Sequence, residues 1–175
     1  VLYSHFAETG TPMVLDLTAA MGILSAKNWS ATGEFAPVEG LGIEAQNTRK
    51  IGREHCYDCP VGCSQMKLAK SGPYSGILTE GHEFETLYSF GSGTGIANLD
   101  AVIAADRLSD ELGFDTMSAG VTVAFAMELF ERGILTLRET DGLELKFGND
   151  QAMITVLRQM AYREGIGDLL ADGTR

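Results

Sequence analysis

The segment from Asn98 to Gly133, NLDAVIAADRLSDELGFDTMSAGVTVAFAMELFERG, decides the fold class. Apolar residues recur in both of its halves at the three-to-four-residue spacing of a helix with one buried face. Asn98 is a favourable N-cap for the first helix, which Gly113 ends. Asp115 or Thr116 caps the second helix, which ends at Gly133. The segment therefore predicts two consecutive helices joined by a short elbow.

Helical patterns continue on both sides of this segment. Thr11 followed by Pro12 is typical of an N-cap with proline at the first helical position, and it predicts a helix over residues 12–25. Apolar or small residues at 84, 87, 88 and 91 form one helical stripe. A last helix begins near Asn149 or Asp150 and stops before residue 165, and a further turn follows at 168–171.

Four other segments have weaker patterns. Residues 29–42 are rich in Gly and Pro and predict a loop, and residues 43–54 resemble a polar helix. Residues 72–76 predict a turn within a short hairpin, and residues 143–148 alternate like a short strand. The expected fold class is all-α and multihelical, with room for one short β-hairpin near the cysteine-containing loop. We expect residues 1–175 to form a single domain.

Composition excludes several classes of protein. The 175 residues include 13 Lys and Arg against 24 Asp and Glu, a net charge of -11, which argues against nucleic acid because phosphates require clustered basic residues. No apolar run approaches the roughly 18 residues of a membrane span, and the N-terminus has no signal-peptide pattern. Because no initiator Met is present, we expect an excised part of a longer chain.

The three cysteines all lie in HCYDCPVGC, residues 55–63, with the spacing C-x2-C-x3-C. An odd number of closely spaced cysteines does not suit a disulfide framework. A zinc site would require a second pair of ligands, and the sequence has neither a second C-x-x-C nor an H-x3-H. His55 is adjacent to Cys56 and would point away from a metal bound by the cysteines. His82 could be a fourth ligand in principle, but no spacing pattern supports it. Three buried, unligated cysteines remain an alternative.

An iron-sulfur cluster suits this loop better. A 4Fe-4S cluster takes thiolate ligands, three from a local loop and a fourth from a distant segment. Pro60 and Gly62 favour a tight non-helical loop whose amide N–H groups donate to sulfides. The sequence therefore predicts that Cys56, Cys59 and Cys63 ligate a 4Fe-4S cluster.

The string from Cys56 to Cys63 resembles the cluster loop of the aldehyde ferredoxin oxidoreductase family, the tungsten and molybdenum bis-pyranopterin enzymes. Other segments resemble the family in the same order along nearly the whole chain: Gly10-Thr11-Pro12, Lys27-Asn28-Trp29, Glu80-Gly81-His82-Glu83-Phe84-Glu85-Thr86, Asp110 to Asp115, Ala124 to Leu129, and Lys146 to Asn149.

The resemblance implies an activity, cofactors and partners. It implies oxidation of an aldehyde with water to a carboxylic acid at a tungsten or molybdenum bis-pyranopterin, with electrons leaving through the 4Fe-4S cluster to ferredoxin or another redox partner. The chain would be the middle, second domain, without the N-terminal pterin domain and the C-terminal part, and inactive alone. The full-length enzyme would be cytoplasmic and could form a homodimer.

The resemblance also implies roles for residues of the elbow. In the family, a D-x-x-G-L-D pattern contacts a pterin, and the matching residues here are Asp110, Gly113, Phe114 and Asp115, with Phe in place of Leu. Two carboxylates and exposed backbone groups at a helix junction can bind the N–H edges of a pterin. Without the resemblance, the same residues would be two ordinary helix caps.

One glutamate of the acidic motif is implied to handle protons beside the metal. Glu85 is the first candidate and Glu83 the second, and burial beside Phe84, Leu87 and Phe90 would raise the pKa of Glu85. We interpret His82, where the family commonly has Pro, as a surface variant rather than a second proton carrier.

Lys67 and Lys70 are candidates for docking an acidic ferredoxin, although two lysines are more often simply solvated charges. Two alternative functions remain open: a stand-alone iron-sulfur electron-transfer domain, and a family relative that reduces aromatic acyl-CoA thioesters.

Overall fold

The computed structural model describes residues 2–35 and 37–174. Its helices are α1 (Leu2–Thr9), α2 (Met13–Ala20), α3 (Ile43–Arg49), α4 (Phe84–Phe90), α5 (Leu99–Leu112), α6 (Thr116–Glu131), α7 (Asp150–Tyr162) and α8 (Ile166–Leu170). Strands β1 (Lys50–Glu54), β2 (Ser64–Leu68) and β3 (Leu78–Glu80) form one antiparallel sheet in the order β1-β2-β3. The prediction of a mainly helical fold with a short hairpin is confirmed.

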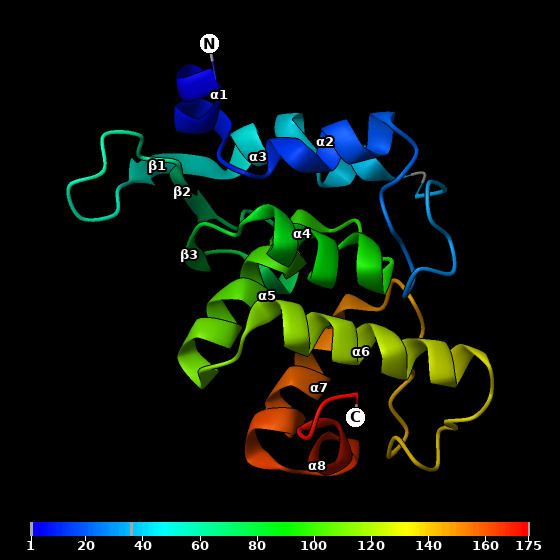
Figure 1. Cartoon of the computed structure of the whole chain (residues 1–175). Coiled ribbons are helices and arrows are strands. Elements are labelled where there is room, and N and C mark those ends of the chain that lie inside the picture. Colours follow the sequence, from blue (N-terminus) through cyan, green and yellow to red (C-terminus); the bar gives the residue numbers. More distant parts are fainter. Residues whose placement is uncertain (1, 36, 175) are drawn as a thin grey trace.

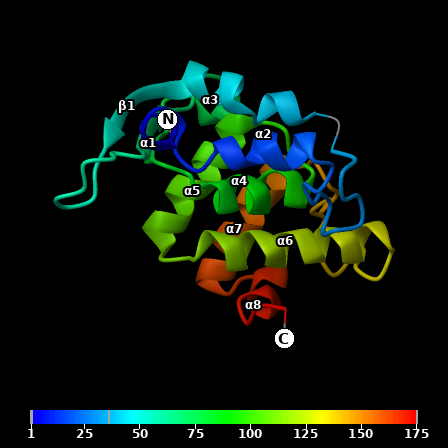
Figure 2. The same ribbon diagram turned by 45° about the horizontal axis from the view of Figure 1, so that its top comes forward.

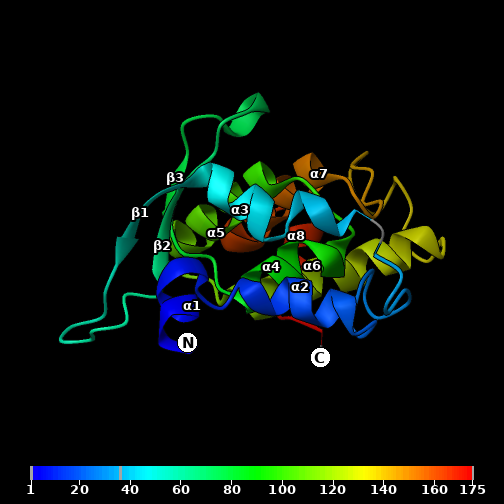
Figure 3. The same ribbon diagram turned by 90° about the horizontal axis from the view of Figure 1, so that it is seen from above.

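The helices stack in layers (Figure 1). The N-terminal helices α1, α2 and α3 lie at one end, α4 and α5 lie in the middle, and α6, α7 and α8 lie towards the C-terminus. The small sheet stands at one side of this stack, as the turned views also show (Figures 2 and 3). The molecule therefore has a helical body and a β-hairpin that projects from it.

The core is centred on α4, α5, α6 and α7. Leu87 and Phe90 of α4, Ile103 of α5, Met127 of α6 and Leu157 of α7 are all fully buried. Burying such side chains is the main favourable term in folding, at about 1.5–3 kcal/mol each. This core holds α4 rigidly, which matters because the acidic motif lies at its N-terminus.

Three predicted helix starts are confirmed by their caps. Asn98 accepts from the N–H of Asp100 at 3.2 Å, Asp115 from that of Ser118 at 2.7 Å, and Asn149 from that of Ala152 at 3.1 Å. These side chains satisfy backbone donors that the first helical turn leaves unpaired.

Three other expectations were wrong in part or entirely. The predicted helix over residues 12–25 ends at Ala20, and α3 ends at Arg49 because residues 50–54 pair with β2 instead. Residues 143–148 form no strand among the described residues. Side chains hold that segment in an irregular path: Thr140 Oγ1 donates to the Leu143 carbonyl at 2.7 Å, and Asn149 Nδ2 donates to the Glu144 carbonyl at 2.9 Å.

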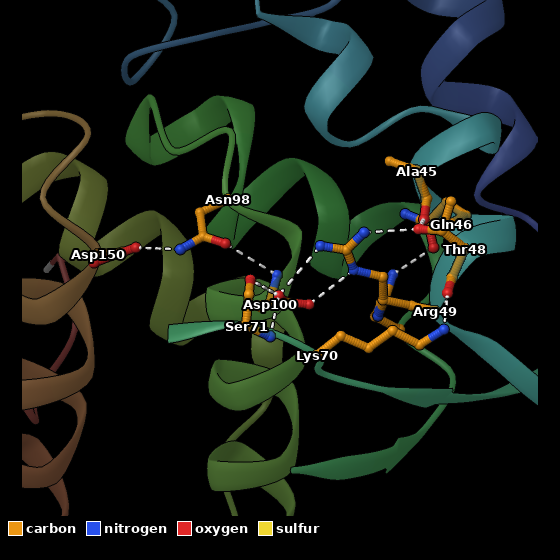
Figure 4. A network of polar contacts seen from close by, with 10 residues as sticks. Ala45, Gln46, Thr48, Arg49, Lys70, Ser71, Asn98, Asp100 and Asp150 are labelled. Carbon is orange, nitrogen blue, oxygen red and sulfur yellow. Dashed lines mark hydrogen bonds and ion pairs between the residues drawn. The ribbon is translucent and has the colours of Figure 1, made fainter. Parts of the chain in front are cut away.

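The ion pair between Arg49 and Asp100 joins α3 to α5 (Figure 4). Arg49 Nε lies 2.9 Å from Asp100 Oδ1, and the N–H of Ser71 donates to Oδ2 at 3.0 Å. Burial alone would raise the pKa of Asp100, but the hydrogen bonds from Arg49 and Ser71 outweigh it and lower that pKa. The pair fixes the base of the hairpin against the helical body.

Strand β2 buries its polar face. Gln65 and Lys67 are 3% and 1% exposed, whereas Met66 and Leu68 are only half-buried. Alternating side chains point to opposite faces of a strand, so an ordinary amphipathic strand with this sequence would bury Met66 and Leu68. Polar partners on the helical body must therefore compensate the buried amide and amine.

Across residues 2–35 and 37–174, none of the helices combines the length and the apolar character that crossing a membrane demands.

Candidate functional site

The three cysteines lie in the loop that joins β1 to β2. Glu54 and Ser64 are the last paired residues of the hairpin, so residues 55–63 extend beyond the sheet and away from the helices (Figures 1 and 3). Cys56 is exposed, and Cys59 and Cys63 are half-buried; all three are free thiols. The hairpin thus presents three thiols at the edge of the molecule.

Local contacts determine the shape of this loop. The N–H of Cys59 donates to the Cys56 carbonyl at 3.0 Å, and His55 Nδ1 lies 3.2 Å from the Cys59 carbonyl oxygen. Gly62 has a φ of 60°, and a Cβ there would lie 2.5 Å from the His55 ring. His55 therefore packs on the loop backbone, and only glycine suits position 62.

Three contacts hold the loop to the body. The Tyr3 hydroxyl donates to the Pro60 carbonyl at 2.6 Å, and Gln65 Nε2 donates to the Cys63 carbonyl at 3.0 Å. Gly10 approaches the same carbonyl so closely that a Cβ would lie 2.6 Å from it. These contacts fix the position of Cys63, the cysteine nearest to the body.

The donor set of the loop consists of three thiols, which are soft ligands. In the described part of the chain, no three His, Cys, Asp or Glu side chains converge as a site for one metal ion. A cluster offers a separate iron atom to each thiolate, so its ligands need not meet at one point. Three soft thiolates within one loop are compatible with such a group.

The acidic motif surrounds the start of α4. Glu80 ends β3 and is exposed, and Glu83 is half-buried just before the helix. Glu85 lies in the first helical turn and is exposed, whereas Leu87 and Phe90 are in the core. The expectation that Glu85 would be buried beside these apolar residues was therefore wrong: they point inward, and Glu85 points outward.

Thr11 fixes the start of α4 rather than that of α2. Its Oγ1 donates a hydrogen bond to the Glu83 carboxylate and accepts one from the N–H of Phe84 at 2.9 Å. Among the described residues no side chain caps the N-terminus of α2, so the predicted N-cap role of Thr11 was wrong. Because Gly10 contacts Cys63 and Thr11 holds Glu83, this short segment connects the cysteine loop with the acidic motif.

The elbow between α5 and α6 is open to solvent. Asp110, Gly113 and Asp115 are exposed, and Phe114 packs partly against the core. Gly113 has a φ of 74° and ends α5, as predicted. Hydrogen bonds from Ser118 lower the pKa of Asp115, whose carboxylate caps α6. Two carboxylates on an exposed turn are compatible with binding the N–H groups of a heterocycle.

Helix α4 also connects the acidic motif to the elbow. Thr86 Oγ1 lies 2.8 Å from Thr116 Oγ1, and Ser89 Oγ donates to the Thr116 carbonyl at 3.1 Å. Thr116 directly follows the elbow. The structure therefore places the cysteine loop, the acidic motif and the elbow along one connected path, with Thr11 and α4 as the links.

Two interpretations of charged side chains were wrong. His82 is 2% exposed and is not a surface variant, and Lys67 is 1% exposed and is not a solvated charge. Lys70 is exposed, and its Nζ donates to the Thr48 carbonyl. Lys67 and His82 contact each other and belong to a buried polar cluster that the sequence did not indicate, because each is bordered in sequence by ordinary strand or loop residues.

One groove lies away from the cysteine loop. It has a volume of about 460 Å³ between the sheet and α5, and Glu80, Arg107 and Glu111 line it. Arg107 and Glu111 pair with each other at 2.8 Å. The groove therefore includes one residue of the acidic motif but none of the cysteines.

Comparison with known proteins identifies the relatives of this chain. A family model described as aldehyde ferredoxin oxidoreductase, domains 2 and 3, matches residues 1–175. The tungsten-containing aldehyde ferredoxin oxidoreductase of Thermococcus kodakarensis is 35% identical over 168 residues, which are 94% of this chain and 27% of that protein. The enzyme of the same name from Pyrococcus furiosus is 34% identical over the same length. The chain thus spans about a quarter of the length of these relatives.

Two further matches were found, one to a curated protein and one to a solved structure. The WOR-like subunit of an aliphatic sulfonate oxidoreductase from Pyrococcus furiosus is 37% identical over 118 residues, 67% of this chain and 19% of that protein. Among solved structures, the active-site complex BamBC of benzoyl coenzyme A reductase, with bound 1,5-dienoyl-CoA, matches with a TM-score of 0.71 at 24% identity. That match covers 93% of this chain and 24% of the other, and it shows a shared fold.

Proposed function

This chain belongs to the aldehyde ferredoxin oxidoreductase family, and from that premise we propose that it is the middle domain of a tungsten or molybdenum pterin enzyme that oxidises aldehydes to carboxylic acids. The domain would contribute cluster ligands, one set of pterin contacts and a proton-handling carboxylate. The rest of a longer chain would supply the remaining contacts, so we expect no activity from residues 1–175 alone.

The cysteine loop would hold a 4Fe-4S cluster. Cys56, Cys59 and Cys63 are the three proposed ligands, and a fourth would come from outside this chain. The loop has the features such a site needs: free thiols, a backbone held in a turn by His55, and anchoring to the body through Cys63.

The elbow would bind one pterin. When bound, the metal-pterin centre supplies the two-electron oxidation of the aldehyde with water. The residues proposed to hold it are Asp110, Gly113, Phe114 and Asp115. The Asp110 and Asp115 carboxylates would accept hydrogen bonds from the N–H edge of the pterin, and the open space around Gly113 lets the ring approach the backbone.

Glu85 is the first candidate for moving protons, and Glu83 is the second. Glu85 is exposed on the first turn of α4. Phe84, the residue before it, lines an apolar hollow of about 200 Å³ together with Trp29 and Tyr88. Apolar walls beside one polar group are typical of a site for a small organic substrate. Glu83 is already tied to Thr11, which favours a role in holding the motif together.

The observation that carries the proposal is the connected path from the cysteine loop through Thr11 and α4 to the elbow. It joins the proposed electron exit to the proposed pterin contacts within one rigid unit. Cluster-bound thiolates also require a reducing, oxygen-poor compartment, for which the cytoplasm is the default.

Metal analysis of the full-length protein, purified without oxygen, tests the proposal. We expect tungsten or molybdenum together with about four iron atoms per chain. An assay of aldehyde oxidation with a ferredoxin or a dye as electron acceptor tests the reaction. Iron without tungsten or molybdenum would instead favour a stand-alone electron carrier, and the absence of both metals would contradict the proposal.

A further inference from the structure

Three successive residues in the loop after α2 have a backbone conformation that side chains rarely adopt. Lys27, Asn28 and Trp29 have φ angles of 46°, 50° and 63°. This left-handed region suits glycine and tolerates asparagine, whereas a bulky residue such as tryptophan seldom enters it. Such conformations persist only where surrounding contacts hold them, and they gather at binding and active sites. We therefore asked what holds these three residues and what their strain achieves.

Hydrogen bonds from distant parts of the chain hold the strained segment. The N–H of Lys27 donates to the Ser92 carbonyl at 2.9 Å, and the N–H of Asn28 donates to the Gly93 carbonyl at 2.9 Å. Asn28 Nδ2 also donates to the Glu128 carboxylate in α6, which the loop after α2 approaches (Figure 1). Asn28 thus links two segments that resemble the family and that the proposed function leaves without a role.

The strain is not repaid by burial of the tryptophan. Trp29 remains 54% exposed, and its ring contact is with Tyr88 of α4, which is 8% exposed. The two ring centroids are 5.6 Å apart, and the ring planes are inclined by 58°. Hydrophobic stabilisation is proportional to the apolar area removed from water, so a half-exposed indole gains only part of it. The segment therefore presents an aromatic ring at the surface beside a second ring that is nearly buried.

These two rings and Phe84 enclose the apolar hollow of about 200 Å³. Leu24 and Thr18 line it as well, and the Thr18 hydroxyl already donates to two carbonyls of its own helix at 2.8 and 3.0 Å. Burial raises the pKa of Tyr88 to about 12, so this ring carries no charge near neutral pH. The walls therefore offer mainly uncharged, apolar surface, which selects an apolar ligand.

The size and the ring geometry narrow the ligand further. An apolar cavity of about 150 Å³ holds benzene, whereas pockets for drug-sized ligands measure about 300–1,000 Å³. A hollow of about 200 Å³ therefore suits a single ring with a short substituent. Aromatic rings favour offset or edge-to-face contacts with centroids about 4.5–7 Å apart, and Trp29 and Tyr88 already have this spacing. A planar aromatic ring is thus the ligand group that these walls fit.

The hollow also lies on the side of α4 that borders Glu85. Phe84 and Tyr88 are four residues apart and therefore share one face of the helix. Glu85 and Tyr88 are three residues apart, so their side chains are neighbours on the helix surface. A ring held against Tyr88 would therefore have its substituent within reach of the Glu85 side of the helix.

We propose that Trp29, with Tyr88 and Phe84, binds the aromatic ring of an aldehyde substrate and directs its carbonyl group towards the side of α4 that carries Glu85. Trp29 is a specificity-determining residue, and Asn28 is a positioning residue because it acts through Trp29. The role in aldehyde oxidation rests on the proposed function. Binding of a ring in the hollow does not, and the two can be tested separately.

The first experiment measures binding without activity. The full-length protein is titrated with 4-fluorobenzyl alcohol, a neutral ring probe, and the dissociation constant is measured by fluorine NMR. Trp29→Leu keeps an apolar side chain but removes the ring, so we expect the dissociation constant to rise about tenfold. Trp29→Phe keeps a ring and should stay within about threefold of the unsubstituted protein.

Tyr162→Ala is the matched control, because Tyr162 is another exposed ring, at 66%, and does not line the hollow. It should leave the dissociation constant unchanged. A probe that does not bind the full-length protein, or one that Trp29→Leu binds as tightly as the unsubstituted protein does, would overturn the inference. An equal loss of affinity in Tyr162→Ala would also overturn it, because binding would then not be specific to the hollow.

Asn28→Gly tests the positioning role. Glycine adopts the left-handed conformation without strain, so the fold should be retained, as helical circular dichroism would show. The bond to Glu128 is lost, and Trp29 is then free to leave the hollow. We expect the dissociation constant of 4-fluorobenzyl alcohol to rise severalfold. Unchanged affinity would show that Asn28 does not position Trp29.

The second experiment links the hollow to the reaction. In the full-length enzyme, the ratio of kcat/KM for benzaldehyde to that for propanal should fall about tenfold in Trp29→Leu, mainly through a higher KM for benzaldehyde. Tyr162→Ala should keep the ratio. An unchanged ratio in Trp29→Leu would overturn the role in specificity. If the full-length protein has neither metal nor activity, the proposed function fails, and the NMR titration still decides whether the hollow binds a ring.

Discussion

The cysteine loop and the surroundings of α4 are built in opposite ways. The three thiols lie within eight residues, and contacts inside the loop give it its shape. The buried cluster behind the acidic motif takes Gln46, Lys67, His82 and Asp106 from four separate places in the sequence. The loop can therefore be disturbed without affecting the body, whereas a change near α4 alters both stability and charge.

Replacing one cysteine should have the largest effect. We expect Cys59→Ser to lose most of the iron of the full-length protein, and all activity with it, because the loop has no spare thiolate. The helical circular dichroism should not change. Tyr57→Ala is the control from the same loop, because Tyr57 is fully exposed; it should keep its iron. If Cys59→Ser retained full iron content, the ligand assignment would be wrong.

A substitution in the core should lower the stability of the fold, unlike a substitution in the cysteine loop. Phe90 of α4 is fully buried, so Phe90→Ala should lower the free energy of unfolding by about 3–5 kcal/mol. Tyr57→Ala should change it by less than about 0.5 kcal/mol. Denaturant titrations of both variants measure the difference. Comparable losses would show that the loop is as much a part of the folding unit as α4.

Variants of Glu85 and Glu83 distinguish a proton-handling carboxylate from a structural one. Glu85→Gln should reduce turnover by about 100-fold or more, the usual contribution of general acid-base catalysis, with metal and iron content unchanged. Glu83→Gln should keep its hydrogen bond with Thr11 and retain more activity. If Glu83→Gln lost the activity and Glu85→Gln did not, the proton-handling role would belong to Glu83.

The helix caps provide the smallest effect and the finest distinction. Asp115→Ala and Asn149→Ala each remove a side-chain cap, so each should cost about 1 kcal/mol of unfolding free energy. Only Asp115 lies at the proposed pterin-binding elbow. Asp115→Ala should therefore also lower the tungsten or molybdenum content, while Asn149→Ala should not. Equal tungsten or molybdenum content in the two variants would show that Asp115 acts only as a helix cap.

Much of the fold could be predicted because its signals are local. Asn98, Gly113 and Asp115 act on backbone groups within four residues of themselves, and the cysteine spacing is itself local. The secondary-structure boundaries that were predicted wrongly depend on residues that are distant in sequence or on side-chain contacts. Residues 50–54 extend from a helix into a strand only because β2 lies beside them, and residues 143–148 follow the side chains that bind them.

The candidate site was less predictable than the fold. The burial of Lys67 and His82 contradicts the simple expectation from residue type, and the exposure of Glu85 contradicts the burial expected from its apolar neighbours. Lysine is almost never fully buried without a partner, and its partner here is fifteen positions away along the chain. No pattern within β2 indicates that its polar face turns inward.

The sequence by itself determined α5, α6 and α7, their caps and the run of three cysteines, because hydrogen bonds to near neighbours and helical periodicity act over a few residues. Only the tertiary structure decided that Thr11 holds the start of α4, that β2 buries Gln65 and Lys67, and that Glu85 points outward. Burial and the pairing of charges depend on which distant segments meet, and packing of the whole chain determines those contacts.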